Sequence, residues 1–235
     1  MSIACPLCEH IPPQRSITLA QGLYHLCGRC TLVWLDPGQR PSAAAERAHY
    51  GTHDNDPADA GYRRFLDRLA TPLEAVLTPG SRGLDFGCGP GPALARMLEE
   101  RGFRVSVHDP FFAPDRQVLD GRYDFITCTE TAEHFHNPRR EFGLLDDMLL
   151  PGGWLGVMTA FRPALTEFAG WHYIRDPTHV CFYSNGAMAW IAAHYGWSLY
   201  IPARNVCLFR KSGGQTDQRW RTGPEPGGSI GERQE

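Results

Sequence analysis

A glycine-rich turn between an apolar strand and a helix constrains this chain more than any other feature. Residues 83–92 read Gly-Leu-Asp-Phe-Gly-Cys-Gly-Pro-Gly-Pro, and the helix that follows carries Leu94, Met97 and Leu98 on one face. Three glycines spaced G-x-G-x-G let the backbone bend sharply and approach a ligand closely. The N–H groups at the start of the helix then point toward that ligand. The turn predicts an α/β domain with a bound ligand at this point.

The same turn resembles the first motif of the class I S-adenosylmethionine-dependent methyltransferases, which reads D-x-G-C-G-x-G. Nicotinamide-binding Rossmann domains have a comparable turn, but their fingerprint places a small residue where Pro92 stands here. The resemblance implies a Rossmann-like α/β sheet with helices on both faces and S-adenosyl-L-methionine as the cofactor. The residues that it places at the cofactor are the acid ahead of the turn and the turn itself: Asp85, Gly87, Cys88, Gly89 and Gly91.

A second acid lies about twenty residues past the glycines, at the distance where nucleotide-binding α/β folds hold a ribose diol. Residues 103–109 alternate apolar and polar side chains and end on Asp109. We expect ribose binding there, with Pro110 beside it, although a solvated strand end is the other interpretation. Thr129, at the end of a later strand, is expected at the cofactor too, because ligands of open α/β sheets bind outside the carboxyl ends of strands.

Composition limits the remaining possibilities. The 235 residues suit one α/β domain with a small appendage, and 42% of them are hydrophobic, enough for a substantial core. No apolar run approaches membrane-spanning length, and no basic-then-apolar signal pattern opens the chain, so a cytoplasmic location is expected. A net charge of −3 gives no overall attraction to nucleic acid or to an anionic membrane. The expected partner is a small molecule.

Four of the eight cysteines form two C-x-x-C pairs separated by 18 residues, a spacing typical of a structural zinc site. Four thiolates complete a tetrahedral shell around Zn2+, and the ligands would be Cys5, Cys8, Cys27 and Cys30. A redox C-x-x-C, or four unrelated thiols, are the alternatives. The other four cysteines lie singly on or beside apolar segments and are interpreted as small core residues.

The chain divides into four predicted parts: a zinc ribbon at 1–40, a linker and helix at 41–80, the cofactor domain at 81–211, and a polar tail at 212–235 that is expected to be disordered. Strands are predicted at 82–87, 103–108, 123–129, 153–160, 197–202 and 205–211. Helices are predicted at 60–77, 91–101, 138–149 and 185–195.

Two segments of this plan leave alternatives open. Residues 110–122 are too short for a helix and a strand, so the third strand of the family pattern is absent or reduced to 117–119. That departure leaves the adenine-binding residues undecided. Residues 49–63 could form a lid that brings Tyr50 and Tyr62 to the cofactor, or they could form a polar linker.

The segment after the strand at 123–128 reads Thr-Glu-Thr-Ala-Glu-His-Phe-His-Asn-Pro. It resembles the E-H-x-x-x-P stretch of small-molecule methyltransferases of the ubiquinone- and menaquinone-biosynthesis type. Glu133 and His134 could orient an acceptor hydroxyl or remove its proton. Alternatively, Glu133 faces the ammonium group of the cofactor and His134 caps the next helix.

A second cluster of aromatic and polar residues spans 171–184 and contains Asp-Pro-Thr-His-Val-Cys-Phe-Tyr-Ser. Similar segments occur in a broad bacterial branch of class I methyltransferases. His179 is the alternative base, and the cluster could line an acceptor pocket. Ordinary packing under the sheet edge is the competing interpretation.

Together these features predict an S-adenosylmethionine-dependent methyltransferase that acts on a small molecule, at oxygen or carbon in preference to nitrogen. Methyl transfer requires mainly alignment and exclusion of water, and an oxygen acceptor usually needs a base or a metal. A zinc-ribbon RNA methyltransferase is one alternative, but residues 1–40 carry three arginines against two acids, too little charge for an RNA-binding face. A non-catalytic module that binds the cofactor and docks a protein partner is the other.

Overall fold

The computed structural model describes residues 3–52 and 55–213. Nearly all of the predicted tail therefore lies outside the described residues, as do His53 and Asp54 of the predicted linker. No helix in the described ranges combines the length and the apolar character needed to cross a membrane.

A six-stranded mixed sheet forms the centre of the molecule, with strand order β5-β4-β6-β7-β10-β9. The first four of these strands are parallel, and β10 pairs antiparallel with both of its neighbours. The strands are β4 (Arg82–Phe86), β5 (Arg104–His108), β6 (Tyr123–Thr129), β7 (Leu149–Met158), β9 (Trp197–Ala203) and β10 (Val206–Lys211). All six predicted strands are present, and β7 begins four residues earlier than predicted.

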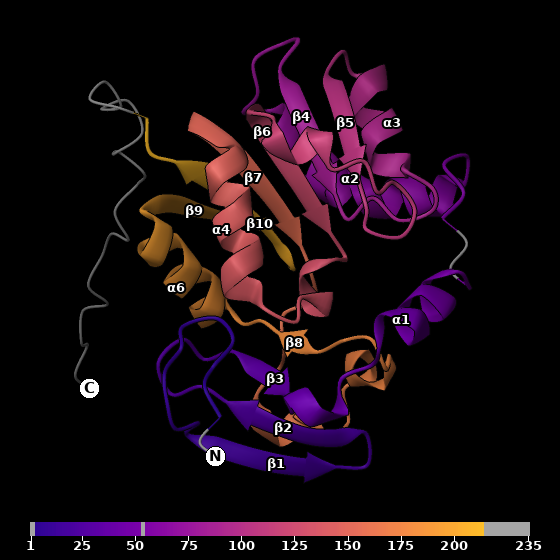
Figure 1. The fold of residues 1–235 in the computed structure, drawn as a ribbon. Helices are drawn as coiled ribbons and strands as arrows, with labels where there is room; N and C mark the ends of the chain where they lie inside the picture. Colours follow the sequence, from indigo (N-terminus) through magenta and orange to yellow (C-terminus); the bar gives the residue numbers. More distant parts are fainter. Residues whose placement is uncertain (1–2, 53–54, 214–235) are drawn as a thin grey trace, which may run out of the picture.

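Helices cover both faces of this sheet (Figure 1). On one face lie α2 (Ala60–Glu74) and α3 (Ala93–Glu100), and on the other lie α4 (Pro138–Met148) and α6 (Asn185–Tyr195). The alternation of side chains along each strand divides the core between the two faces. Phe125 of β6 packs with the first pair of helices, whereas Ile126 packs with the second. The expected Rossmann-like architecture is confirmed.

The third strand of the family pattern is absent from the described part of the chain. Residues 117–120 form a short 3₁₀ helix, η2 (Gln117–Asp120), and β5 lies at the edge of the sheet. Of the two alternatives left open for residues 110–122, the structure shows the first, in which the third strand is absent. The loop instead returns to β5, because Asp109 and Ala113 form an isolated antiparallel bridge.

The N-terminal residues form a second sheet, in the order β1-β2-β3-β8. Its strands are β1 (Arg15–Leu19), β2 (Gly22–Leu26), β3 (Val33–Leu35) and β8 (Cys181–Phe182). Three short strands thus lie around the cysteine pairs, but the sequence did not indicate that the fourth strand comes from residues nearly 150 positions later. The two sheets share one hydrophobic core, which contains all four paired cysteines.

The segment between the two sheets is more ordered than a polar linker. It forms η1 (Pro37–Gln39) and α1 (Ala43–Tyr50), and Ser42 caps α1 by accepting a hydrogen bond from the N–H of Ala45. Three further short helices complete the fold: η3 (Ala132–His134), α5 (Leu165–Phe168) and η4 (His172–Arg175). In Figure 1, α1 lies at the level of the junction between the two sheets, and its His49 contacts Asp176, which precedes β8.

Candidate active site

A cavity of about 690 Å³ opens at the carboxyl ends of β4, β5 and β6. This volume is typical of sites for small molecules and cofactors. Its lining includes every residue that the sequence nominated for the cofactor or for catalysis: Tyr50, Tyr62, Asp85, Gly87, Cys88, Gly89, Gly91, Asp109, Pro110, Thr129, Glu133, His134 and His179. The topology therefore brings residues from six separate parts of the chain into one cavity.

The glycine turn forms one wall of the cavity, and its geometry requires glycine. Gly87 has a φ of 80°, and a Cβ built there would lie 2.2 Å from the Thr131 side chain. A Cβ on Gly91 would lie 2.2 Å from the backbone oxygen of Asn55. The N–H of Gly87 donates to the carbonyl of His108 at 2.8 Å. Side chains at these positions would force the turn out of place.

Asp109 holds the turn and the loop after β5 together. One carboxylate oxygen accepts a hydrogen bond from the N–H of Gly89 at 3.1 Å. The other accepts from the N–H groups of Phe111 and Phe112, at 2.8 and 3.1 Å. A carboxylate oxygen has two lone pairs, so the oxygen that accepts only from Gly89 can accept one more hydrogen bond, from a ligand hydroxyl in the cavity.

Asp85 lies within β4, 4% exposed, and accepts a hydrogen bond from the Thr127 hydroxyl at 2.7 Å. Burial raises the pKa of this carboxyl to about 6, and the nearby charge of Asp109 acts in the same direction. At neutral pH the protein therefore holds a buried negative charge at the cavity wall, a costly arrangement in the absence of a cation.

Two tyrosines from α1 and α2 line the cavity. Tyr50, at the end of α1, lies with its ring centroid 5.1 Å from that of His134, and Tyr62, on α2, stacks on Phe65. Burial raises the pKa of Tyr62 to about 12, so its hydroxyl stays neutral. Contacts across the cavity hold α1 in place: His49 Nε2 lies 3.1 Å from the carboxylate of Asp176, and His136 Nε2 lies 2.8 Å from that of Glu46.

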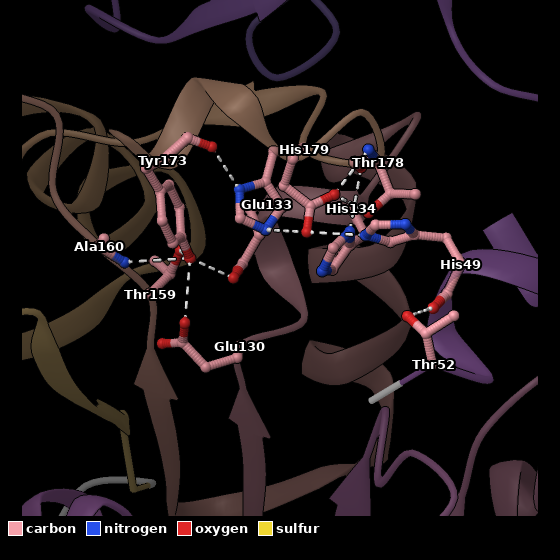
Figure 2. Close-up of polar contacts among 11 residues, drawn as sticks. His49, Thr52, Glu130, Glu133, His134, Thr159, Ala160, Tyr173, Thr178 and His179 are labelled. Carbon is pink, nitrogen blue, oxygen red and sulfur yellow. Dashed lines mark hydrogen bonds and ion pairs between the residues drawn. The ribbon is translucent and has the colours of Figure 1, made fainter. Parts of the chain in front are cut away.

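Glu133, on η3, is completely buried, and Figure 2 shows its carboxylate beside Tyr173. The hydroxyl of Tyr173 donates a hydrogen bond to Oε1 of Glu133, and Glu130 Oε2 lies 3.2 Å from the same hydroxyl. The second oxygen of Glu133, Oε2, has no hydrogen-bond partner among the described residues.

Glu130 is a site residue that the sequence reasoning did not nominate. It lines the cavity directly after β6, with a φ of 48°. Burial, and then the negative charge of Glu133, raise the pKa of Glu130 to about 8, so near neutral pH it is mostly protonated. Its place at a strand end was a usable signal, but only the fold shows that two glutamates converge on one tyrosine hydroxyl.

His134 and His179 meet although 45 positions separate them in the sequence, with ring centroids 4.8 Å apart. Backbone contacts align their segments, because the N–H of Val180 donates to the carbonyl of Glu133 at 2.8 Å. Burial lowers the pKa of His134, which favours the neutral imidazole. Asn137, and not His134, caps α4, so the capping alternative for this histidine is wrong.

The four paired cysteines converge at the connection between β2 and β3, which contains Cys27 and Cys30. Sγ of Cys5 lies 3.5 Å from Sγ of Cys30, and Sγ of Cys8 lies 3.3 Å from Sγ of Cys27. All four sulfur atoms lie within 4.8 Å of one another, and none forms a disulfide. Zinc–thiolate bonds of about 2.3 Å place sulfur atoms about 3.8 Å apart in a tetrahedron, so the donor set fits Zn2+ closely.

We expect Asp85→Asn to stabilise the folded protein by about 1–3 kcal/mol at pH 8, because it removes a buried charge and can keep the Thr127 hydrogen bond. A folded-state pKa of about 6, against an ordinary 3.8, means that the penalty exists when Asp85 is ionised and fades as the pH falls. The gain should drop to about half at pH 5. Denaturant unfolding at both pH values measures it, with exposed Asp120→Asn as the control. A gain that is equal at the two pH values would contradict the assignment.

Comparisons with known proteins place this site in a family. A family model described as a methyltransferase domain matches residues 53–200, more than half of the chain. A ubiquinone biosynthesis O-methyltransferase of Shewanella pealeana is 31% identical over 80 residues, 34% of each protein. Another, of Marinobacter nauticus, is 30% identical over 115 residues, 38% of this chain and 48% of that protein. The chain thus aligns with less than half the length of these curated relatives.

Among solved structures, the 1,6-didemethyltoxoflavin-N1-methyltransferase of Burkholderia thailandensis, with its substrate and S-adenosylhomocysteine bound, superposes with a TM-score of 0.53. The two proteins are 16% identical, and the match covers 82% of this chain and 96% of the other. At this identity the likeness concerns the fold alone. With the family match and the glycine turn at the carboxyl end of β4, the chain belongs to the methyltransferase domain family and has the fold of the class I S-adenosylmethionine-dependent methyltransferases.

Proposed function

We propose that this protein transfers the methyl group of S-adenosyl-L-methionine to an oxygen or carbon atom of a small-molecule acceptor. The observation that carries the proposal is that one cavity is lined both by the glycine turn with Asp109 and by Glu133, His134 and His179. This arrangement supports a cofactor bound at the glycine turn and an acceptor bound next to it, in a cavity of a size typical for small-molecule sites.

For the cofactor, the proposed assignment uses the groups whose geometry fits it. The turn at Gly87, Gly89 and Gly91 lets the ligand approach the backbone, and Asp109 accepts hydrogen bonds from the ribose hydroxyls. At the methionine end, the buried charge of Asp85 complements a positively charged ligand, with Tyr62 and Thr129 nearby on the lining. Cys88, Pro110 and Tyr50 complete the proposed cofactor contacts. The structural neighbour binds S-adenosylhomocysteine, which supports this choice of cofactor.

When bound, S-adenosylmethionine supplies an electrophilic methyl carbon, which bonds to the acceptor atom while the carbon–sulfur electron pair stays on sulfur. The protein positions the acceptor, excludes water and promotes loss of the proton from an acceptor hydroxyl. We assign that last task to the cluster of Glu133, His134 and His179. The names of the two curated relatives support oxygen as the acceptor atom.

For the cysteine cluster we propose a structural zinc ion with Cys5, Cys8, Cys27 and Cys30 as its ligands. Backbone N–H groups of Arg29 and Cys30 point at Sγ of Cys27, at 3.3 and 3.4 Å, and would stabilise a thiolate there. Four protein ligands leave no open position, so the ion would support the small sheet and take no part in the chemistry. A cytoplasmic location, where thiols stay reduced, accords with this role and remains a prediction.

We expect the full-length protein to bind S-adenosylmethionine and S-adenosylhomocysteine with micromolar-range affinity. Asp109→Ala should weaken binding at least tenfold, because the ribose contacts and the anchoring of Gly89 are both lost. Titration calorimetry measures the affinity, with Asp120→Ala, an exposed acid outside the cavity, as the matched control. No binding by folded wild type would refute the central claim, whereas equal affinity in Asp109→Ala would refute only the ribose role.

One zinc ion per chain is the expected result of elemental analysis. Cys27→Ser should lose it, whereas Cys88→Ser should retain it. Because β3 pairs with β8, loss of the ion should also lower the stability of the segment that carries His179. If freshly purified wild type contains no stoichiometric metal, or if the Cys27→Ser variant retains the ion, the proposed zinc site is wrong.

Labelled S-adenosylmethionine, offered side by side with a metabolite extract and with total RNA, tests the acceptor class. We expect label in a small molecule. His134→Ala and His179→Ala should each reduce turnover about 10²–10⁴-fold while cofactor affinity stays near wild type. His172→Ala, an exposed histidine outside the cavity lining, is the control. Label in RNA, lost at higher salt, would support the RNA-methyltransferase alternative instead.

A further inference from the structure

Three side chains that line the cavity are of the types that bind metal ions. Glu133, His134 and His179 each offer one ligand atom, and these atoms all lie within 4.8 Å of one another. All three residues line the cavity. They are separate from the cysteine cluster and come from η3 and from the segment just before β8. Two imidazoles and one carboxylate form a donor set typical of open, reactive metal centres.

The two histidines are oriented as metal ligands are. Nδ1 of His134 lies 3.0 Å from the carbonyl oxygen of Thr178, and Nδ1 of His179 lies 2.8 Å from that of Tyr173. A carbonyl can only accept, so in both rings Nδ1 carries the proton. In the neutral form of each ring, Nε2 then keeps its lone pair. Nε2 of His179 also lies 3.8 Å from Oδ2 of Asp176, which is longer than a hydrogen bond. Ligating histidines commonly donate their other N–H to a backbone carbonyl in this way, which fixes both the tautomer and the ring orientation.

The carboxylate of Glu133 also has an oxygen that is available to bind a metal ion. Tyr173 donates to Oε1 of Glu133, whereas Oε2 has no hydrogen-bond partner in residues 3–52 and 55–213. Glu133 is 0% exposed. A buried carboxylate oxygen without a donor is costly, and a bound cation is one way in which proteins offset that cost. The unpartnered oxygen thus points to a ligand independently of the arrangement of the histidines.

We propose that Glu133, His134 and His179 bind a second metal ion, a divalent transition cation such as Mn2+, Fe2+, Co2+ or Zn2+. The nitrogen donors favour these ions over Mg2+ and Ca2+, which prefer all-oxygen shells. Three protein ligands leave at least one coordination position open toward the cavity. Tyr173 is a positioning residue, because it holds Oε1 of Glu133 and, through its carbonyl, the ring of His179.

The role of this ion in catalysis rests on the proposed methyltransferase function. An acceptor hydroxyl bound in the open position would have its O–H bond polarised, and the proton would pass to water in the cavity. The oxygen electron pair would then form the bond to the methyl carbon as the methyl–sulfur bond breaks. In this arrangement the two histidines act through the metal and do not take up the proton themselves.

The test is a titration of the zinc-loaded full-length protein with Mn2+, followed by electron paramagnetic resonance, and a parallel titration with Co2+. Manganese is a poor match for four thiolates, so the ribbon should keep its zinc. We expect one additional ion per chain, with magnetic coupling to two imidazole nitrogens. Glu133→Gln and His179→Ala should each weaken its binding at least tenfold, and His172→Ala should leave it unchanged. Circular dichroism establishes that the variants are folded.

The outcomes separate this proposal from the proposed function. If neither Mn2+ nor Co2+ binds beyond the ribbon zinc, or if Glu133→Gln and His179→Ala bind as tightly as wild type, the metal site is wrong. If the ion binds at these residues but no methyl transfer is found, the site stands and the proposed function falls. Transfer at the full rate by protein emptied of the second ion would overturn its catalytic role and leave the function intact.

Discussion

The pairing of β3 with β8 is the contact on which the rest of the site depends. Through it, the N-terminal sheet holds residues 178–183 against the end of β6, where Val180 bonds to Glu133 and Thr178 bonds to His134. The N–H of Leu35 donates to the carbonyl of Val180 at 2.9 Å and extends the same ladder. The small sheet with the cysteine cluster is therefore linked to the Glu133, His134 and His179 side of the cavity, a connection that the spacing of the cysteines in the sequence does not indicate.

The electrostatics of the cavity share a single theme, which is buried negative charge. Asp85, Asp109 and Glu133 are all buried, and Glu130 keeps its proton near neutral pH because burial, and then the charge of Glu133, raise its pKa to about 8. Such a site favours positively charged ligands. A sulfonium cofactor on the side of Asp85 and a metal ion on the side of Glu133 would each compensate part of this charge, so the two proposals address the same physical cost at opposite ends of one cavity.

Local sequence patterns were enough to predict the elements. Strand–turn–helix periodicity and Gly or Pro-Gly stops located the six strands of the large sheet and the helices α2, α3, α4 and α6, but they gave no sign of β8 or α5. The errors of a few residues lie at the ends of elements, where helix fraying and early strand pairing decide the boundary. The glycine turn indicated the cofactor site because its function requires a backbone that only glycine allows. The missing strand at 117–119 was left open because a short apolar triplet has no periodicity to assign.

The sequence by itself determined the family, the turn at Gly87 and the two cysteine pairs, since each depends on residues a few positions apart. Only the tertiary structure decided that His179 lies beside His134, that Glu130 and Glu133 share Tyr173, and that one oxygen of Glu133 is left without a donor. All of these features depend on how segments about 40 or more positions apart in the sequence pack together. Their geometry follows from strand order and from the β3–β8 pairing, and no local pattern of residues encodes either one.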